Sequence, residues 1–310
     1  MKKGVTFLLV IAALAVAFFY FVATPQSSVD GEPTEAQVRA AAAELEIELA
    51  RAVIDVREFG GTDVVLVDGE ATFSIDGDGD APAGQGFIEY GEVYGAFWRG
   101  LEAEVHALYY INAGGTGTFP YLISLTYEDG NLVETSRVVL GDRIGVSDIH
   151  IEQSEPNNYE IWVSLVERLP RQGMTAQPTV PMVLRFVRGS AGLILGDVAY
   201  GTLENYSIAV SEPLPESTVG TTFTVRGEAV GPWYFEAVFP VELQDFSGTI
   251  LTQTAAQAQG EWMTTSLVPF TATVTAPAGA TGLYILVLRR DNPSGEAQFD
   301  ESIQIPIVIK

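Results

Sequence analysis

The sequence contains no cysteine and almost no lysine, and both absences narrow the possible functions. Without cysteine, the chain can form neither disulfide bonds nor thiolate metal sites. Lysine occurs only at Lys2, Lys3 and Lys310, so arginine supplies the remaining positive charge. The net charge of −24 repels nucleic-acid phosphates and anionic lipid headgroups, which argues against nucleic acid as a partner. Such a surface favours solubility and can also attract basic partners.

Common signatures of catalysis are also missing. The chain has no GxSxG, SxxK or GxxxxGK[ST] motif, and no GxGxxG follows an apparent strand. Ser136 and Ser211 lack a local nucleophile signature. The only histidines, His106 and His150, lie in apparent strands without HxxxH or HxH spacing, which favours sheet residues over zinc ligands. We therefore expect no cofactor and no enzymatic activity.

The longest uncharged apolar run lies near the N-terminus, in residues 4–23. Its twenty residues can span a hydrocarbon core of about 30 Å as a helix. Bulky Phe21 occupies a position where a signal-peptide cleavage site needs a small residue, which favours an uncleaved anchor over a cleaved signal. Because Lys2 and Lys3 precede the run, we expect a cytoplasmic N-terminus, with the chain after Thr24 outside. The sequence thus predicts a single-pass cell-membrane protein.

Residues 25–60 are expected to form a linker followed by a juxtamembrane helix. Residues 24–33 are polar and contain proline, and Thr34 begins a weak capping box with Gln37. Apolar residues then recur at helical spacing from Val38, which predicts a helix to about Phe59. This helix could pack on its own domain or pair with a partner helix, but its heptad pattern is short for a coiled coil.

Residues 61–198 have the short apolar runs and turn signals of a β-rich domain. The predicted strands are residues 63–68, 71–75, 105–111, 121–127, 133–140, 148–153, 159–165 and 183–187. The strings GGTGTFPYL (114–122), LGDRI (140–144) and PRQGMTAQPTV (170–180) resemble an uncharacterised β domain of exported bacterial proteins. That resemblance implies fold and location only, because no activity is assigned to the family.

One acidic loop resembles a calcium site. Asp76, Asp78 and Asp80 alternate with glycine, which suits a hard cation. The loop departs from the EF-hand pattern, since Ala81 replaces the glycine and Phe87 replaces the bidentate glutamate. We therefore expect a solvated acidic turn, with calcium as the weaker alternative.

Residues 203–310 show alternating apolar residues and regularly spaced turns. The predicted strands are residues 206–211, 222–229, 235–243, 248–254, 268–275, 282–289 and 302–309, which suit a β-sandwich. The segments GPWYFEAVFPVELQDFSG, AQAQGEWMTTSLVPF and RRDNPSG closely resemble Gmad2, the immunoglobulin-like domain of bacterial spore-germination and envelope proteins. The resemblance covers about the last third of the chain and implies a binding module.

Five residues in these segments are candidates for ligand binding: Trp233, Tyr234, Trp262, Asp291 and Asn292. Strand alternation would turn Tyr234 away from its neighbours Trp233 and Phe235, toward solvent. In the alternative interpretation, Trp233, Phe235, Phe239, Trp262 and Phe270 pack the sandwich core, and residues 291–295 form a turn.

The sequence therefore predicts an all-β protein with two tandem β domains, an N-terminal transmembrane helix and a short juxtamembrane helix. The expected segments are residues 1–24, 25–60, 61–198 and 203–310, the last an immunoglobulin-like sandwich. The expected function is non-catalytic: an extracytoplasmic adaptor that binds a cell-envelope glycan or a protein. The alternatives are a wall-polymer hydrolase using carboxylates of the middle domain, and a structural subunit of an envelope assembly.

Overall fold

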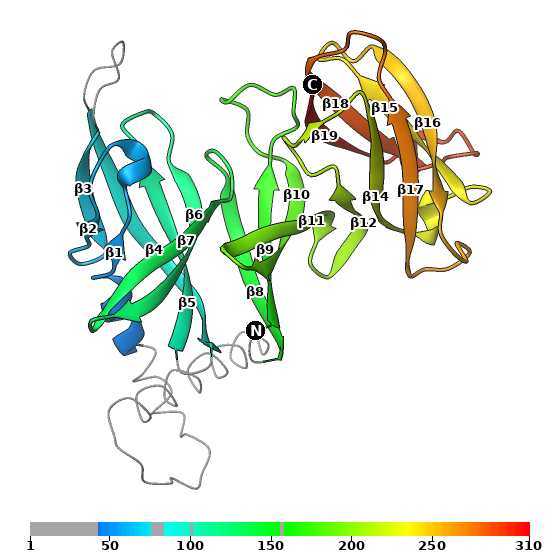
Figure 1. Cartoon of the computed structure of the whole chain (residues 1–310). Coiled ribbons are helices and arrows are strands. Elements are labelled where there is room, and N and C mark those ends of the chain that lie inside the picture. Colours follow the sequence, from blue (N-terminus) through cyan, green and yellow to red (C-terminus); the bar gives the residue numbers. More distant parts are fainter. Residues whose placement is uncertain (1–42, 76–83, 100–101, 156–157) are drawn as a thin grey trace, which may run out of the picture. The chain divides into compact units, whose positions relative to one another are not determined.

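The computed structural model describes residues 43–75, 84–99, 102–155 and 158–310, which are predominantly β (Figure 1). The predicted anchor, residues 4–23, and the calcium candidates Asp76, Asp78 and Asp80 lie outside the described residues. Among the helices of the described ranges, none has both the length and the apolar character needed to cross a membrane.

The chain divides into two compact units. The first contains the chain up to Ile144 together with His150–Glu160 and Arg188–Ile194. The second contains Gly145–Ile149, Ile161–Val187 and Leu195–Lys310. The predicted boundary between residues 198 and 203 lies near the turn of a β-hairpin, and it remains a prediction.

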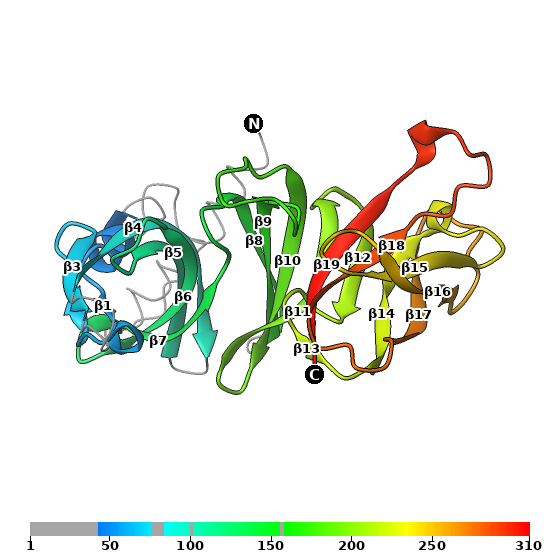
Figure 2. The same ribbon diagram turned by 90° about the horizontal axis from the view of Figure 1, so that it is seen from above.

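A seven-stranded sheet forms most of the first unit, in the order β2-β1-β7-β6-β5-β4-β3. The strands are β1 (Val53–Ile54), β2 (Val64–Val65), β3 (Glu70–Ile75), β4 (Gly84–Arg99), β5 (Glu102–Asn112), β6 (Phe119–Glu128) and β7 (Asn131–Val139). The two ends of this sheet meet, because Val67 and Glu70 exchange backbone hydrogen bonds of 2.9 and 3.2 Å. Asp68 and Gly69 make this tight turn with positive φ values of 53° and 87°, as their sequence predicts. Figure 2 shows the strands arranged in a ring.

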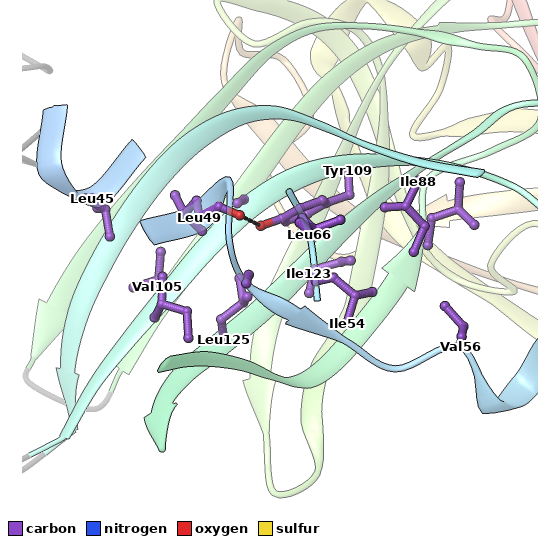
Figure 3. Packing of buried hydrophobic residues seen from close by; sticks show 14 of the residues in the cluster. Leu45, Leu49, Ile54, Val56, Leu66, Ile88, Val105, Tyr109, Ile123 and Leu125 are labelled. Carbon is purple, nitrogen blue, oxygen red and sulfur yellow. Dashed lines mark hydrogen bonds between the residues drawn. The ribbon is translucent and has the colours of Figure 1, made fainter. Parts of the chain in front are cut away.

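The interior of this ring is apolar. Its buried residues include Leu45, Leu49, Ile54, Val56, Leu66, Ile88, Val105, Tyr109, Ile123 and Leu125 (Figure 3). Leu45 and Leu49 belong to a helical segment at residues 43–49, which closes the core from one side. The Tyr109 hydroxyl donates a hydrogen bond of 3.1 Å to the Leu49 carbonyl, so the helix end and β5 share a buried polar contact.

The helix ends earlier than the sequence predicts: its last residue is 49, and the chain enters β1 at Val53. The β-branched residues Val53 and Ile54 favour a strand, and they pair with β2 on one side and β7 on the other. The 3-10 helix η1 (Arg57–Phe59) follows. Arg137 of β7 joins η1 to the sheet, since its guanidinium pairs with Glu58 of η1 at 2.9 Å. Glu134, on the same strand as Arg137, pairs with the guanidinium at 2.5 Å and orients it.

Strand β4 was not predicted, because its many glycines disfavour a strand. In the structure, one of these glycines packs closely against an aromatic ring, and another lies at a shift in the strand register. A Cβ at Gly86 would lie 2.1 Å from the Phe73 ring, so this glycine makes room for a buried aromatic side chain. The pairing of β4 with β5 shifts register at residues 90–92, around Gly91.

The second sheet has twelve strands, in the order β13-β19-β18-β15-β16-β17-β14-β12-β11-β10-β9-β8. Its first members in sequence are β8 (Gly145–Glu155), β9 (Asn158–Glu167), β10 (Val180–Gly189), β11 (Gly192–Thr202), β12 (Asn205–Glu212) and β13 (Thr218–Val219). The others are β14 (Thr222–Val230), β15 (Val238–Gln244), β16 (Ile250–Ala258), β17 (Leu267–Thr275), β18 (Gly282–Arg289) and β19 (Ser302–Ile309).

Strands β12–β19 form the predicted C-terminal sandwich. One layer contains β12, β14 and β17, and the other contains β15, β16, β18 and β19. Strand β16 joins the layers, because it pairs with β15 along its length and with β17 at Gln257 and Ala258. Burial alternates strictly along β17 and β19, whose inward side chains are Val268, Phe270, Ala272, Val274, Ile303, Ile305, Ile307 and Ile309.

Replacing Tyr109 with phenylalanine tests the contact between the helix end and β5. The substitution removes one of two donors to the Leu49 carbonyl, which keeps its hydrogen bond of 3.2 Å from the Ala52 amide. We expect the free energy of unfolding of the first unit to fall by about 0.5–1.5 kcal/mol. Urea denaturation followed by circular dichroism measures this change. Tyr110→Phe is the matched control, because the adjacent Tyr110 is only half-buried. Equal effects of the two substitutions would contradict the assignment.

Candidate functional site

Three loops meet at one end of the C-terminal sandwich and contain all five binding candidates. They are residues 231–237 between β14 and β15, residues 259–266 between β16 and β17, and residues 290–301 between β18 and β19. The pairing of Val230 with Leu267, and of Arg289 with Ser302, places these connections at the same end. We call these three loops together the loop end.

The first loop lies directly against the second. After β14, Gly231-Pro232-Trp233 forms the 3-10 helix η2, with Pro232 among its first residues, where the fixed φ of proline favours a helical turn. A Cβ at Gly231 would lie 1.9 Å from the Thr264 carbonyl oxygen and 2.3 Å from that of Trp262. Only glycine permits this approach of two backbones, so the two loops have a fixed relative position.

The third loop is joined to the first by two hydrogen bonds to its backbone. The Asp291 amide donates to the Trp233 carbonyl at 3.0 Å, and Nε of Arg290 donates to the Pro232 carbonyl at 3.0 Å. The Arg290 guanidinium also lies over the Phe299 ring at 5.9 Å, where a cation–π attraction favours it. Phe299 ends the short helix η3 (Ala297–Phe299).

Asn292 shapes the third loop from within. Its Nδ2 donates to the Glu296 carbonyl at 2.9 Å and to the Asp300 carboxylate at 2.8 Å, and its Oδ1 accepts from the Ser294 hydroxyl at 2.6 Å. The Asn292 side-chain amide thus holds both ends of the turn. This geometry agrees with the alternative interpretation of residues 291–295 as a turn, and it assigns Asn292 a structural role.

Trp233 and Tyr234 are buried, so the prediction that Tyr234 faces solvent is wrong. Tyr234 is 4% exposed, and its hydroxyl donates to the Val268 carbonyl at 2.7 Å. Strand alternation does not apply here because η2 precedes Tyr234 and β15 begins only at Val238. The exposed aromatic residue is instead Phe235, at 43%. Burial removes both Trp233 and Tyr234 as surfaces on which a ligand could stack.

The exposed apolar side chains of the loop end were not among the predicted site residues. Met263 is 73% exposed, Phe235 43% and Phe299 42%, while Trp262 beside Met263 is half-buried. These residues lie in loops, where no periodicity separates exposed from buried positions. The only sequence signal for these exposed residues was that each lies next to a turn residue or next to other aromatic residues.

A group of polar side chains lies buried in the first unit. His106 of β5 and Ser124 of β6 face one another across the sheet, with His106 Nδ1 3.1 Å from Ser124 Oγ. The Tyr159 ring of β9 lies 5.1 Å from the His106 ring. Arg188 of β10 donates to the Glu104 carboxylate and, at 2.9 Å, to the Tyr159 hydroxyl.

Burial dominates the electrostatics of this group. It lowers the pKa of His106 to about 3, with a smaller contribution from the positive charge of Arg188. Burial also raises the pKa of Tyr159 well above its ordinary value, and the nearby Glu104 carboxylate adds to that effect. His106 is therefore neutral at physiological pH, between a hydroxyl and an aromatic ring.

The Ser124–His106 pair is enclosed and lacks the access that a nucleophile requires. Both side chains are completely buried, so the arrangement forms a polar layer within the first unit. His150 is half-buried on β8, and Ser211 Oγ donates to the Arg226 carbonyl. Within the described ranges, no cluster of three or more His, Asp or Glu residues could hold a metal ion.

The burial of neutral His106 predicts that acid destabilises the first unit. The unfolded chain binds a proton at this histidine near its ordinary pKa of about 6.5, whereas the folded chain does so only near 3. Stability from His106 is therefore complete above about pH 6.5 and is lost as the pH falls toward 3. Between about pH 6.5 and about pH 5 we expect a loss of about 2 kcal/mol.

Urea denaturation across this pH range, with His106→Asn and His150→Asn, tests the assignment. Asparagine at position 106 retains a polar group for Ser124 but does not titrate, so this variant should lack the pH dependence between about pH 6.5 and about pH 5. The His150→Asn variant should keep it. If the His150→Asn variant loses the pH dependence and the His106→Asn variant keeps it, the assignment to His106 is wrong.

Comparison with protein families confirms the resemblance of the C-terminal sandwich. Residues 207–297 match the model of Gmad2, described as the immunoglobulin-like domain of bacterial spore germination. The matched range includes the first two loops of the loop end and part of the third. It does not reach residues 61–198, for which the resemblance to an exported bacterial β domain remains a prediction. A comparison with curated proteins finds no match to this chain.

Proposed function

We propose that this chain is a non-catalytic adaptor protein, anchored in the cell membrane, that binds a protein of the cell envelope through the loop end. The observation that carries the proposal is the set of exposed apolar side chains, Phe235, Met263 and Phe299, on three loops that contact one another. Three exposed apolar side chains on loops that are held together favour an interaction site.

The fixed geometry of the loops supports this function. Gly231 packs against the backbone of the second loop, Asp291 bonds to Trp233, and Asn292 holds the third loop. A surface held in its binding conformation loses little conformational entropy when a partner binds, which raises affinity. Loops on a rigid sandwich are a common arrangement for recognition.

The exposed residues favour a protein over a glycan. Sugars commonly stack on flat, exposed aromatic rings, but Trp233 and Tyr234 are buried and Trp262 is half-buried. Met263 is flexible and apolar, and such side chains adapt to irregular protein surfaces. A wall-polymer hydrolase finds less support, because the buried Glu104 carboxylate is paired with Arg188.

The location outside the cell rests on the sequence. Residues 4–23 have the length and composition of a membrane anchor, and Lys2 and Lys3 favour a cytoplasmic N-terminus. The β units would then face the outside, where the lack of cysteine makes folding independent of disulfide formation.

Photo-crosslinking of the full-length chain tests the binding surface. A photoreactive amino acid in place of Met263 should form a discrete crosslinked product with one envelope protein. The same replacement at Phe246 is the matched control, because Phe246 is 46% exposed in the loop after β15, at the opposite end of the sandwich. The Met263→Glu variant should reduce capture of that protein about tenfold, since a charge disrupts an apolar contact.

The other outcomes point to other functions. Crosslinks at position 246 but not at 263 would locate the binding surface elsewhere. Retention of the protein on purified peptidoglycan, lost in Met263→Glu, would make the loop end a glycan-binding site. Release of soluble sugar fragments would identify a hydrolase.

A further inference from the structure

We propose that the loop end binds a basic, apolar segment of its partner, in which arginine or lysine residues flank large apolar side chains. The inference rests on the proposed function and specifies the chemistry of the partner. It follows from the acidic residues in the loops that carry the exposed apolar side chains, and from the contacts of Arg290, the single basic residue of these loops.

The three loops that carry the exposed apolar side chains are rich in carboxylates. Its three loops contain six acidic residues and only one basic residue: Glu236, Glu261, Asp291, Glu296, Asp300, Glu301 and, as the base, Arg290. The connections at the opposite end, residues 213–221, 245–249 and 276–281, contain only two charges, Glu216 and Asp245. Negative charge therefore accumulates at the end with the exposed Phe235, Met263 and Phe299 side chains.

Arg290 does not neutralise this surface, because it is already engaged within the domain. It donates to the Pro232 carbonyl, lies over Phe299 and forms an ion pair of 3.8 Å with Glu301. None of the other five carboxylates forms an ion pair with a basic residue in the described part of the chain. Their charges remain available to a partner.

Neutral groups hold three of these carboxylates in position. The Met263 amide donates to Glu261 at 3.0 Å, Gln298 donates to Glu296 at 2.7 Å, and Asn292 donates to Asp300 at 2.8 Å. Charges held in position on a binding surface steer an oppositely charged partner and disfavour a like-charged one. An anionic lipid surface is excluded by the same repulsion, which leaves a basic protein segment as the occupant.

Selection from an unbiased library of displayed peptides on the full-length chain in detergent tests the inference. Selected peptides should be enriched in arginine and lysine together with leucine, phenylalanine or tryptophan. Their affinity should fall about tenfold in Met263→Glu and about fivefold in a Glu236→Gln/Glu296→Gln double variant. Raising the salt concentration from about 50 mM to about 500 mM should weaken binding to the unmodified chain.

Two controls separate local from general effects. Phe246→Glu places a charge at a phenylalanine that is about as exposed as Phe235 but lies at the opposite end of the sandwich. Glu216→Gln removes an exposed charge from the connection between β12 and β14, also at the opposite end. Neither should change peptide affinity.

The outcomes distinguish the inference from the proposed function. Peptides that lose affinity in Met263→Glu but are neutral or acidic would overturn the proposed partner chemistry and leave the loop end as a binding surface. The same conclusion would follow if the Glu236→Gln/Glu296→Gln variant bound basic peptides with the same affinity as the unmodified chain. If no selected peptide depends on Met263, the loop end is not a binding surface, and the proposed function fails with the inference.

Discussion

The position of the loop end depends on the burial of one aromatic ring, Phe239. Three rings surround it, with centroid distances of 5.5 Å to Trp233, 5.2 Å to Tyr234 and 4.9 Å to Phe270. Aromatic groups in edge-on and tilted contacts bury large apolar areas in defined geometries. Because Trp233 and Tyr234 are buried in the core, the chain between η2 and β15 turns outward after Tyr234, and Phe235 lies at the surface. The core of the sandwich thus determines which side chains the loop end exposes.

The two units use polar groups differently. In the sandwich, hydrogen bonds around Asn292 and Tyr234 fix loops at the surface, next to side chains that a partner can reach. In the first unit, His106 and Ser124 are enclosed together with Glu104. Buried polar groups require partners because they have lost contact with water. The buried Glu104 carboxylate has its partner in Arg188, so the pair carries no net charge. Polar side chains therefore order exposed loops in one unit and form an internal layer in the other.

The sequence predicted the sandwich well where strands alternate and turns are short. Strands β18 and β19 have the expected bounds, and Asp68-Gly69 forms the expected hairpin. The errors have local physical causes. The helix ends early because Val53 and Ile54 pair with β2 nearby and with the distant strand β7, and no local pattern reveals the pairing with β7. Strand β4 was missed because glycines that serve close packing look like loop residues.

Of the predicted site, the sequence identified the loops but not the exposed side chains. All five predicted residues belong to the loop end: Trp233, Tyr234, Trp262, Asp291 and Asn292. The sequence could locate them because turns are local signals, here Gly231-Pro232, Gly260-Glu261 and Asn292-Pro293. Which of these side chains is buried depends on contacts between loops, such as that of Gly231 with Thr264. Those contacts join residues more than thirty positions apart, so alternation around Tyr234 could not predict them.

The direction of β19 determines where an amine-reactive label attaches to the sandwich. This strand begins at Ser302, beside the loop end, and runs the length of the sandwich to Ile309, next to Lys310. Lys310 is the only lysine after Lys3, so it carries the one side-chain amine between residue 4 and residue 310. A label or a solid support coupled to that amine attaches at the far pole of the sandwich. Immobilisation through Lys310 therefore orients the domain with Phe235, Met263 and Phe299 directed away from the support.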